Sequence, residues 1–583
     1  MADTAGTERP VLWGIVGAPM AFAPSTGGSK KVGVPSRAKQ GERLGGRFAG
    51  LSSAFDEQAT LTASLGASDP QLVIVFEAVD EREDLSGVAS RAGLEILAEV
   101  DRDFEPDPDF PRTSVNKDLP VTGCLHAVCI TEQAKAHIIG QWNKWQATGE
   151  VDRGYAPLKQ LFAHLKDVRP WGPGDRVRSV DVAAALAGML PGDHNVEIEL
   201  WFRQSAAARE RAEAEVTSLI EQGGGQVITT ARVAEVGYHG MKCTVPLELL
   251  QRLAQGDYDA VTVVKSAHVM YLRVSAQSYL LSGESPLVEP GTDPLPTSDP
   301  VLCVLDGVPV ANHPLLAGRV IVEDPDDLGS DTIVESELRR HGTAMASVCV
   351  WGDRSLNEPA AQRPVLVRPI LTPARDTTDK GEELPPNALA PDLMRSIFRE
   401  LFTGDGQNPP AAPSVVVVSL SVGDPAAPFD GIISSWARTL DWLSATYGVI
   451  VIVSAGNHVV LPVPGGTSAL LSLTGADRAK VVNEGVAATF PRRSLLAPAD
   501  SINGLSVGAL NDDGAGGVGI SGYQFDPADG VLIINPISAL GAGHHRSVKP
   551  DVVAPGGRSR FLKPVVGEAT EARPAPHTAL GPG

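Results

Sequence analysis

The chain has 583 residues, which is too many for one ordinary hydrophobic core, so several domains are expected. Lys and Arg number 49 against 70 Asp and Glu, giving a formal net charge of −21, and a surface this acidic argues against nucleic acid or membrane as the main partner. Apolar residues make up 43% and charged residues 20%, which excludes an intrinsically disordered chain.

A signal peptide is the less favoured interpretation of the N-terminal segment. An apolar stretch at 11–23 ends in an Ala-x-Ala pattern, but the acidic Asp3 and Glu8 precede it where a signal peptide has net positive charge. No other apolar run reaches membrane-spanning length, so we predict a cytoplasmic protein. Gly, Ser and basic residues then dominate, and we predict a flexible arm over residues 1–70.

Two α+β units follow the arm. Residues 71–190 contain apolar, strand-like runs at 71–79 and 123–130, with a helical stretch at 84–98 between them and further helical stretches after them. Residues 195–275 have the order β-α-β-β-α-β, which predicts a ferredoxin-like module. A Pro-rich linker is expected at 276–300.

From residue 301 onward the pattern changes to continuous apolar runs that alternate with helical stretches. The runs lie at 301–308, 364–370, 414–423 and 449–457. Runs of this kind are typical of parallel strands covered on both faces. The alternation predicts an α/β fold with a doubly wound, mostly parallel sheet, in which chemistry takes place at the carboxyl ends of the strands.

Three polar residues are predicted at that edge. Asp306 follows the first run, His341 begins a helix of small residues, and Asn457 ends the fourth run. Each alone has an ordinary structural interpretation, as a turn aspartate, a packing histidine and a turn asparagine. Together they form an orienting carboxylate, a proton-transferring imidazole and an amide donor for an oxyanion, which is the set that a serine nucleophile needs for acyl transfer.

The motifs around these residues resemble, in order, those of the subtilisin-like serine proteases (peptidase S8/S53 type). They are "VLCVLDGVPVANHPLLAGRV", "HGTAMAS", "SLSVGDP", "VIVSAGN", "SINGLSVGAL" and "VKPDVVAPGG". The resemblance implies that Asp306 orients His341, that His341 is the general base and acid, and that Asn457 donates to the oxyanion. It also implies that Ser421, Val422 and Gly423 lie along the substrate backbone, in a subtilisin-like peptidase domain over 301–583.

The nucleophile departs from this pattern. In the family a Gly-Thr-Ser motif follows the Lys-Pro-Asp stretch, here Lys549 to Asp551, by a few tens of residues, and this chain has none there. Ser559 is too close to that stretch, and Ser468 comes too early, in "GGTS". We therefore expect no nucleophilic serine in this chain, and we expect truncation rather than an evolved pseudoenzyme.

The sequence thus predicts a serine endopeptidase by family whose present form is inactive. The alternative is a non-catalytic peptide-binding or regulatory scaffold with the same fold. By resemblance, 195–275 is either a propeptide-like chaperone and inhibitor or a fixed accessory domain. The expected partners are a peptide or protein substrate and a regulatory protein. No cofactor or metal is expected, and the acidic stretch 323–331 is interpreted as a solvated loop.

Overall fold

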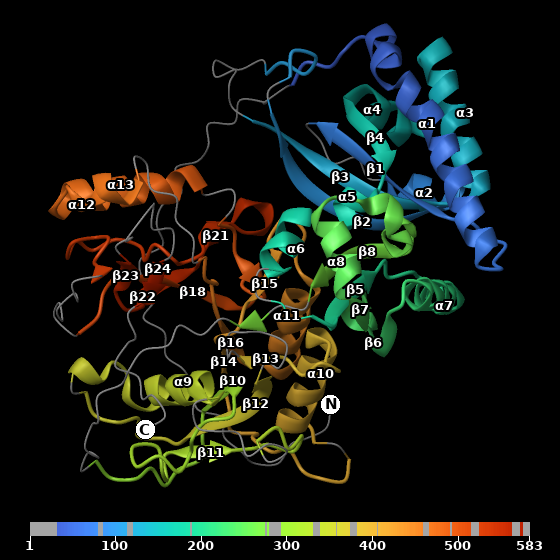
Figure 1. The fold of residues 1–583 in the computed structure, drawn as a ribbon. Helices are drawn as coiled ribbons and strands as arrows, with labels where there is room; N and C mark the ends of the chain where they lie inside the picture. Colours follow the sequence, from blue (N-terminus) through green and yellow to red (C-terminus); the bar gives the residue numbers. More distant parts are fainter. Residues whose placement is uncertain are drawn as a thin grey trace.

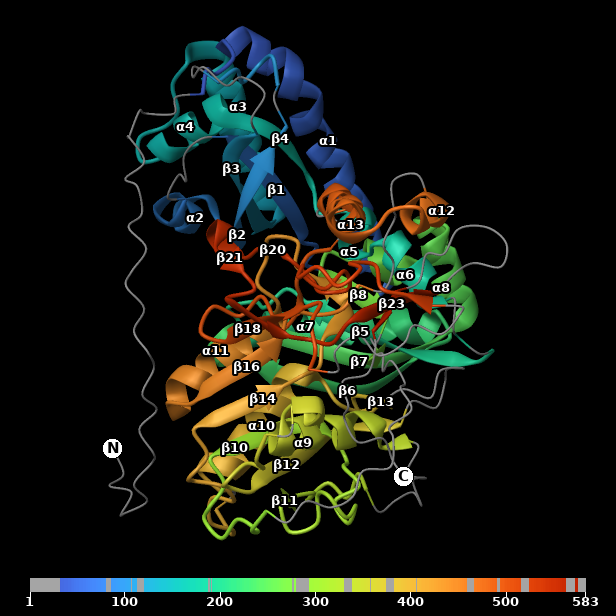
Figure 2. The same cartoon turned by 90° about the vertical axis from the view of Figure 1, so that its left-hand side faces the viewer.

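The protein has three units in the computed structural model, two smaller α+β units and one larger α/β unit (Figure 1). The structure describes residues 32–79, 85–105, 107–112, 120–186, 189, 191–274, 277–278, 293–329, 338–356, 358–373, 382–404, 406–458, 466–489, 493–514, 524–562 and 572–574. In Figure 2 the first unit lies at the top, farthest from strands β10 and β12 of the third unit.

The first unit is an antiparallel sheet covered by helices, with strand order β2-β3-β1-β4. Its strands are β1 (Leu72–Val79), β2 (Leu94–Phe104), β3 (Val121–Ile130) and β4 (Leu165–Pro170). Its helices are α1 (Arg37–Ser64), α2 (Ser86–Ala92), α3 (Glu132–Thr148) and α4 (Ala156–His164). The chain order and strand order are those of a ferredoxin-like module, which the sequence had indicated only for the second unit.

Helix α1 corrects the prediction of a flexible arm over 1–70. Ser36 caps the helix, and Leu44, Phe48, Leu51 and Phe55 are buried on one side of it at helical spacing. Phe48 stacks on Trp142 of α3, with ring centroids 4.2 Å apart. The apolar stripe outweighs the glycines between its members, so the prediction was wrong for this part. Residues 1–31 lie outside the described residues.

The second unit has the predicted ferredoxin-like order, with its four strands arranged β6-β7-β5-β8. Its strands are β5 (Asp193–Leu200), β6 (Gln226–Val233), β7 (Tyr238–Pro246) and β8 (Val269–Val274). Its helices are α7 (Ala206–Gln222) and α8 (Leu247–Ala254), and the short helices α5 (Pro173–Arg176) and α6 (Ser179–Leu186) connect it to the first unit. Two short 3-10 turns, η2 (Tyr258–Ala260) and η3 (Thr262–Lys265), precede β8.

The third unit is built on a sheet of order β22-β18-β16-β14-β10-β12, in which all neighbouring strands are parallel. These strands are β10 (Leu302–Gly307), β12 (Val365–Pro373), β14 (Val417–Leu420), β16 (Ile450–Ser454), β18 (Leu505–Leu510) and β22 (Val552–Pro555), and β11 (Val320–Val322) also pairs with β12. The doubly wound, mostly parallel sheet predicted from the sequence is confirmed.

Helices cover both faces of this sheet. Cys303 and Leu305 of β10 belong to a core that contains residues of α10 (Ala390–Phe402) and α11 (Ser435–Tyr447). Val304, which points to the opposite face, packs with residues of α9 (Arg340–Trp351). This alternation explains why the four residues from Leu302 to Leu305 are all apolar.

Shorter elements complete the third unit. The helices are α12 (Gly466–Leu471) and α13 (Gly475–Thr489). The strands are β15 (Asp424–Pro428), β17 (Leu496–Ala497), β19 (Gln524–Phe525), β20 (Gly541–Ala542), β21 (Val548–Lys549), β23 (Ser559–Leu562) and β24 (Ala572–Pro574). Across the part of the chain that the structure describes, no helix combines the length and the apolar character needed to cross a bilayer.

The edge of the main sheet is extended by a strand that comes from the segment after the second unit. Strand β13 (Glu382–Glu383) pairs antiparallel with the end of β12, and β9 (Gln277–Ser278) pairs antiparallel with β13. Residues 277–278 of the predicted linker are therefore part of a sheet, whereas 279–292 lie outside the described residues. The second unit is thus connected to the third by strand pairing as well as by sequence.

Candidate active site

The carboxylate of Asp306 and the ring of His341 are in contact. Asp306 is the penultimate residue of β10 and is fully buried, and His341 lies in the first turn of α9. The distance from Asp306 Oδ1 to His341 Nδ1 is 2.5 Å, and the same oxygen accepts the Gly307 N–H at 2.7 Å. With Nδ1 held by the carboxylate, Nε2 is the ring nitrogen left to exchange a proton with a reacting group.

Burial and charge act on the His341 ring in opposite directions. Burial lowers the pKa of His341, but the charge and hydrogen bond of Asp306 and the charge of Glu382 raise it by more. The net result is a pKa above the ordinary value of 6.5. The protonated, cationic form of the imidazole is therefore stabilised at this position, as general base catalysis requires.

Two glycines allow β10 and α9 to approach each other this closely. A Cβ atom on Gly342 would lie 2.1 Å from the carbonyl oxygen of Gly307, which is a backbone atom that cannot move aside. A Cβ atom on Gly307 would lie 1.8 Å from Oε1 of Glu382. The Asp-Gly and His-Gly pairs in the sequence are thus explained by packing. Sequence reasoning missed Glu382, because it lies in the acidic, loop-like stretch "KGEELPP".

Asn457 and the Ser421–Gly423 segment follow the neighbouring strands of the sheet. Ser421 comes directly after β14, and Asn457 lies three residues after the end of β16, past Gly456 with φ 105°. Because β10, β14 and β16 are adjacent and parallel, their carboxyl ends share one edge with Asp306. Asn457 is exposed, and its backbone forms a bridge with Ser538.

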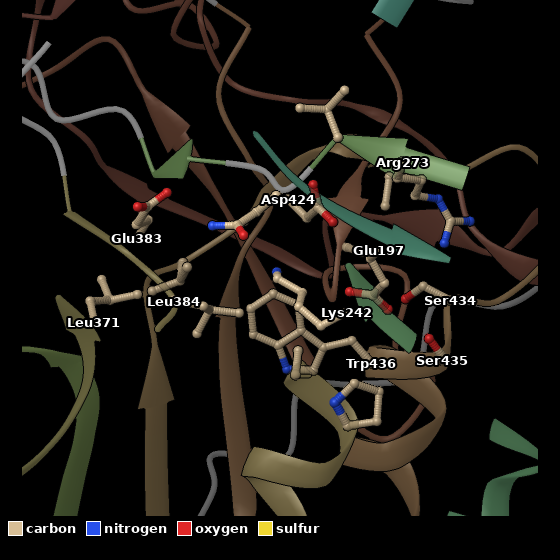
Figure 3. Close-up of a pocket in the computed structure, with 18 residues that line it drawn as sticks. Glu197, Lys242, Arg273, Leu371, Glu383, Leu384, Asp424, Ser434, Ser435 and Trp436 are labelled. Carbon is tan, nitrogen blue, oxygen red and sulfur yellow. The ribbon is translucent and has the colours of Figure 1, made fainter. Parts of the chain in front are cut away.

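Two of the three substrate-strand candidates, Val422 and Gly423, line a small cavity between the second and third units (Figure 3). Val422 is buried, and with Gly423 it forms part of the wall of a cavity of about 50 Å³. On the other side the sheet of the second unit contributes Glu197, Lys242 and Arg273. The second unit therefore covers the segment that, by resemblance, would lie along a substrate.

Ion pairs hold the second unit at this position. Arg273 of β8 and Arg438 of α11 both approach the buried Glu199 of β5, at 3.1 and 3.6 Å. The Tyr238 hydroxyl donates to Glu197 at 2.9 Å. Asp424, which follows Gly423, is half-buried beside these charges, and desolvation raises its pKa to about 6 even though Arg273 lowers it.

The pKa of Asp424 predicts a pH-dependent contribution to stability. Its folded-state pKa of about 6 exceeds the ordinary value of 3.8, so its contribution is fully present below about pH 4 and is lost as the pH rises through 6. We expect Asp424→Asn to gain stability relative to the wild type over that window, by on the order of 1–3 kcal/mol, and to gain no more above it. Urea unfolding at pH 4, 5, 6 and 7.5 measures this difference, and a difference independent of pH would contradict it.

The two serines dismissed on sequence grounds remain poor nucleophile candidates. Ser559 lies in β23 and is fully buried, and its hydroxyl donates to Asn535 Oδ1 at 2.6 Å. Ser468 falls within α12, and its side chain is outside the described part of the structure. Among the described residues, the hydrogen bonds of His341 are made with Asp306 and Glu382 and not with a serine.

The acidic loop and the cysteines have structural roles. In the loop at 323–331 the Asp324 carboxylate accepts the backbone N–H groups of Leu328 and Gly329, at 3.0 and 2.8 Å. Within the described ranges, no group of three or more His, Cys, Asp or Glu side chains is arranged to hold a metal ion. All five cysteines are free thiols; four are buried and Cys349 is half-buried.

A buried carboxylate that holds a histidine, at the carboxyl edge of a doubly wound sheet, is the arrangement found in one class of serine hydrolases. Comparison with known proteins gives the family of this unit: residues 297–579 match the model of the subtilase family, Peptidase_S8, so this region is a subtilase-family domain.

Individual relatives are distant. The uncharacterized protein y4bN of Sinorhizobium fredii (strain NBRC 101917 / NGR234) is 31% identical over 155 residues, which cover 25% of this chain and about a third (32%) of that protein. The prenylagaramide maturation protease PagA is 16% identical with a TM-score of 0.25, over 48% of this chain and 70% of PagA. A variant of the protease domain of PatA is 17% identical with a TM-score of 0.24, over 48% and 74%.

Proposed function

We propose that the unit over 301–583 is the peptidase domain of a subtilisin-like serine endopeptidase. Asp306 orients His341, and His341 takes the proton of the attacking hydroxyl and returns it to the leaving amine. The observation that carries this proposal is the contact between the fully buried Asp306 carboxylate and His341 Nδ1 in a domain of the subtilase family.

The other roles follow the strand order. Asn457 donates its side-chain N–H to the oxyanion, and Ser421, Val422 and Gly423 hold the substrate backbone in extended form. We propose that the nucleophilic serine is not one of residues 1–583. The hydrogen bond that ties the Ser559 hydroxyl to Asn535 supports this proposal for that residue.

We further propose that the module over 195–275 acts like a propeptide. Two features support this role: its sheet covers the segment at Val422 and Gly423, and strand β9 pairs with β13 through Ser278 and Glu382. A chain bound at a sheet edge in this way competes with any extended peptide for the same backbone groups. A fixed accessory domain would leave this edge occupied permanently, so cleavage after β9 and release of the module distinguish the two roles.

The rival function is a non-catalytic scaffold that binds peptides or a regulatory protein. The covered cavity is compatible with it, because a scaffold needs the extended groove but no base. A buried, oriented Asp–His pair favours the peptidase, since a groove that only binds peptides has no use for a proton acceptor at this point.

We also propose the cytoplasmic location that the N-terminal sequence predicted.

A fluorophosphonate probe, which labels activated serines, tests the proposal. We expect the 583-residue chain to remain unlabelled and to have no peptidase activity, because losing the nucleophile costs factors on the order of a million in kcat. If the genomic sequence beyond codon 583 encodes a Gly-Thr-Ser segment, the extended protein is expected to be labelled, and His341→Ala should abolish that labelling. Labelling of the present chain at Ser468 or Ser559 would contradict the proposal. A stop codon followed by unrelated sequence would favour the scaffold.

A further inference from the structure

The first turn of helix α9 is capped by a carboxylate from a distant strand. Glu382 of β13 is 5% exposed, and its Oε2 accepts the backbone N–H of His341 at 2.7 Å. A second backbone contact of this carboxylate is with Gly342. The other carboxylate oxygen, Oε1, occupies the space that a side chain at Gly307 would need. Both oxygens therefore lie against the backbone next to Asp306 and His341.

This capping is not the usual local kind. Helix N-termini are normally capped by a Ser, Thr, Asp or Asn that directly precedes the helix. At α9 the N-cap position holds Arg339, which makes no side-chain capping bond. The N–H groups at the start of α9 are instead satisfied by Glu382, which favours a negative charge there because the helix N-terminus is the positive end of its dipole.

The backbone of Glu382 is itself held on both sides. Glu382 pairs with Pro373 of β12 on one side and with Ser278 of β9 on the other. The carboxylate is therefore fixed by an ordered strand rather than by a loose loop. A buried carboxylate at this point has an energetic penalty: burial and the charge of Asp306 raise its pKa, His341 lowers it, and the net value is about 7.

We propose that Glu382 is a positioning residue: by binding the backbone at the start of α9, it seats the His341 ring against Asp306. The inference rests on the proposed function only in that His341 is then the general base. A simple helix cap would need no charge and no link to the sheet edge. Glu382 has an ionisable carboxylate and is linked to the sheet edge through β13, and it contacts the peptide unit of the histidine that meets Asp306.

The titratable groups around His341 come from three elements. Asp306 on β10 and Glu382 on β13 act on the ring directly, and the thiol of Cys349 on α9 interacts with Asp306. The pKa of Cys349 is raised to about 12 by burial and by Asp306, so it stays neutral near pH 7. Near neutral pH the pKa of His341 is therefore raised by the charges of the two carboxylates, Asp306 and Glu382.

NMR of the 583-residue chain labelled at histidine tests the role without requiring a nucleophile. The His341 ring is assigned from the signals lost in His341→Gln, and two readings are taken: its titration curve and the downfield signal of the Nδ1 proton held by Asp306. In Glu382→Ala we expect the downfield signal to be lost or broadened and the apparent pKa of His341 to fall. In Glu382→Gln, which keeps an acceptor for the His341 N–H, we expect the signal to persist while the pKa falls.

Glu383→Gln is the matched control, because its side chain alternates to the other face of the same two-residue strand and lines the cavity in Figure 3. It should leave both readings of His341 unchanged. The proposal is overturned if folded Glu382→Ala retains the downfield signal and the wild-type pKa. If Glu382→Ala does not fold, an unchanged His341 pKa in Glu382→Gln overturns it. Failure of fluorophosphonate labelling leaves both readings intact, so the two proposals fail separately.

Discussion

Asp306→Asn is expected to lower kcat by about four orders of magnitude in any form of this protein that carries the nucleophile. The Asp306 carboxylate is fully buried, and its Oδ1 holds His341 Nδ1 at 2.5 Å. Asparagine has nearly the same shape but presents an amide, which stabilises the wrong tautomer of the imidazole and gives no charge to balance the imidazolium. Hydrolysis of a peptide substrate, measured as kcat, gives the effect directly.

Asp392→Asn is the matched control for this substitution. Asp392 lies at the start of α10 in the same unit, is partly exposed and pairs with Arg395. Surface pairs of this kind contribute little, so kcat should stay within a factor of two of the wild type. If Asp306→Asn retained more than a tenth of the wild-type kcat, Asp306 would not be the residue that orients the base.

The largest expected loss of stability follows from Glu199→Ala. Glu199 is 4% exposed and lies between Arg273 of its own unit and Arg438 of the third unit. Removing it leaves two guanidinium groups without their shared partner, one of them enclosed at the interface. Breaking one side of a buried ion pair typically costs about 3–5 kcal/mol. We therefore expect a lower urea midpoint and faster protease cleavage at the boundary between the second and third units.

Arg252→Ala provides the comparison. Arg252 forms an exposed pair with Glu248 on α8 of the same unit and does not line the covered cavity, and its removal should not shift the urea midpoint measurably. Equal midpoints for Glu199→Ala and the wild type would show that the second unit is not held in place by this cluster. A lower midpoint without faster cleavage would place the effect inside the second unit rather than at the interface.

The elements that were predicted well are those whose pattern is local. The strands β10, β12, β14 and β16 were recognised as largely apolar runs, since parallel strands covered on both faces bury most of their side chains. Once the runs were recognised, the residues that follow them became the candidate site residues, because the carboxyl ends of parallel strands meet at one edge of the sheet. Asp306 and His341 were placed together by this argument, and the structure has them in contact.

Local pattern failed where neighbouring residues give the wrong signal. The stretch that forms α1 is rich in glycine and basic residues, and it becomes a helix because its apolar side chains are buried on the first unit. Residues 84–98 were predicted to be helical, but the helix α2 ends at Gly93, with φ 72°, and β2 begins at Leu94. In both cases the tertiary packing outweighs the propensity of the segment.

Sequence alone therefore determined the class of fold, the positions of the main parallel strands and the expectation that Asp306 and His341 meet at one edge, because burial on both faces of a sheet produces consecutive apolar residues. Tertiary structure alone decided that Glu382 caps the helix of His341 and that the second unit covers Val422 and Gly423. Those contacts join residues separated by tens to hundreds of positions. No periodicity encodes them, since they form only when separate strands and units pack together.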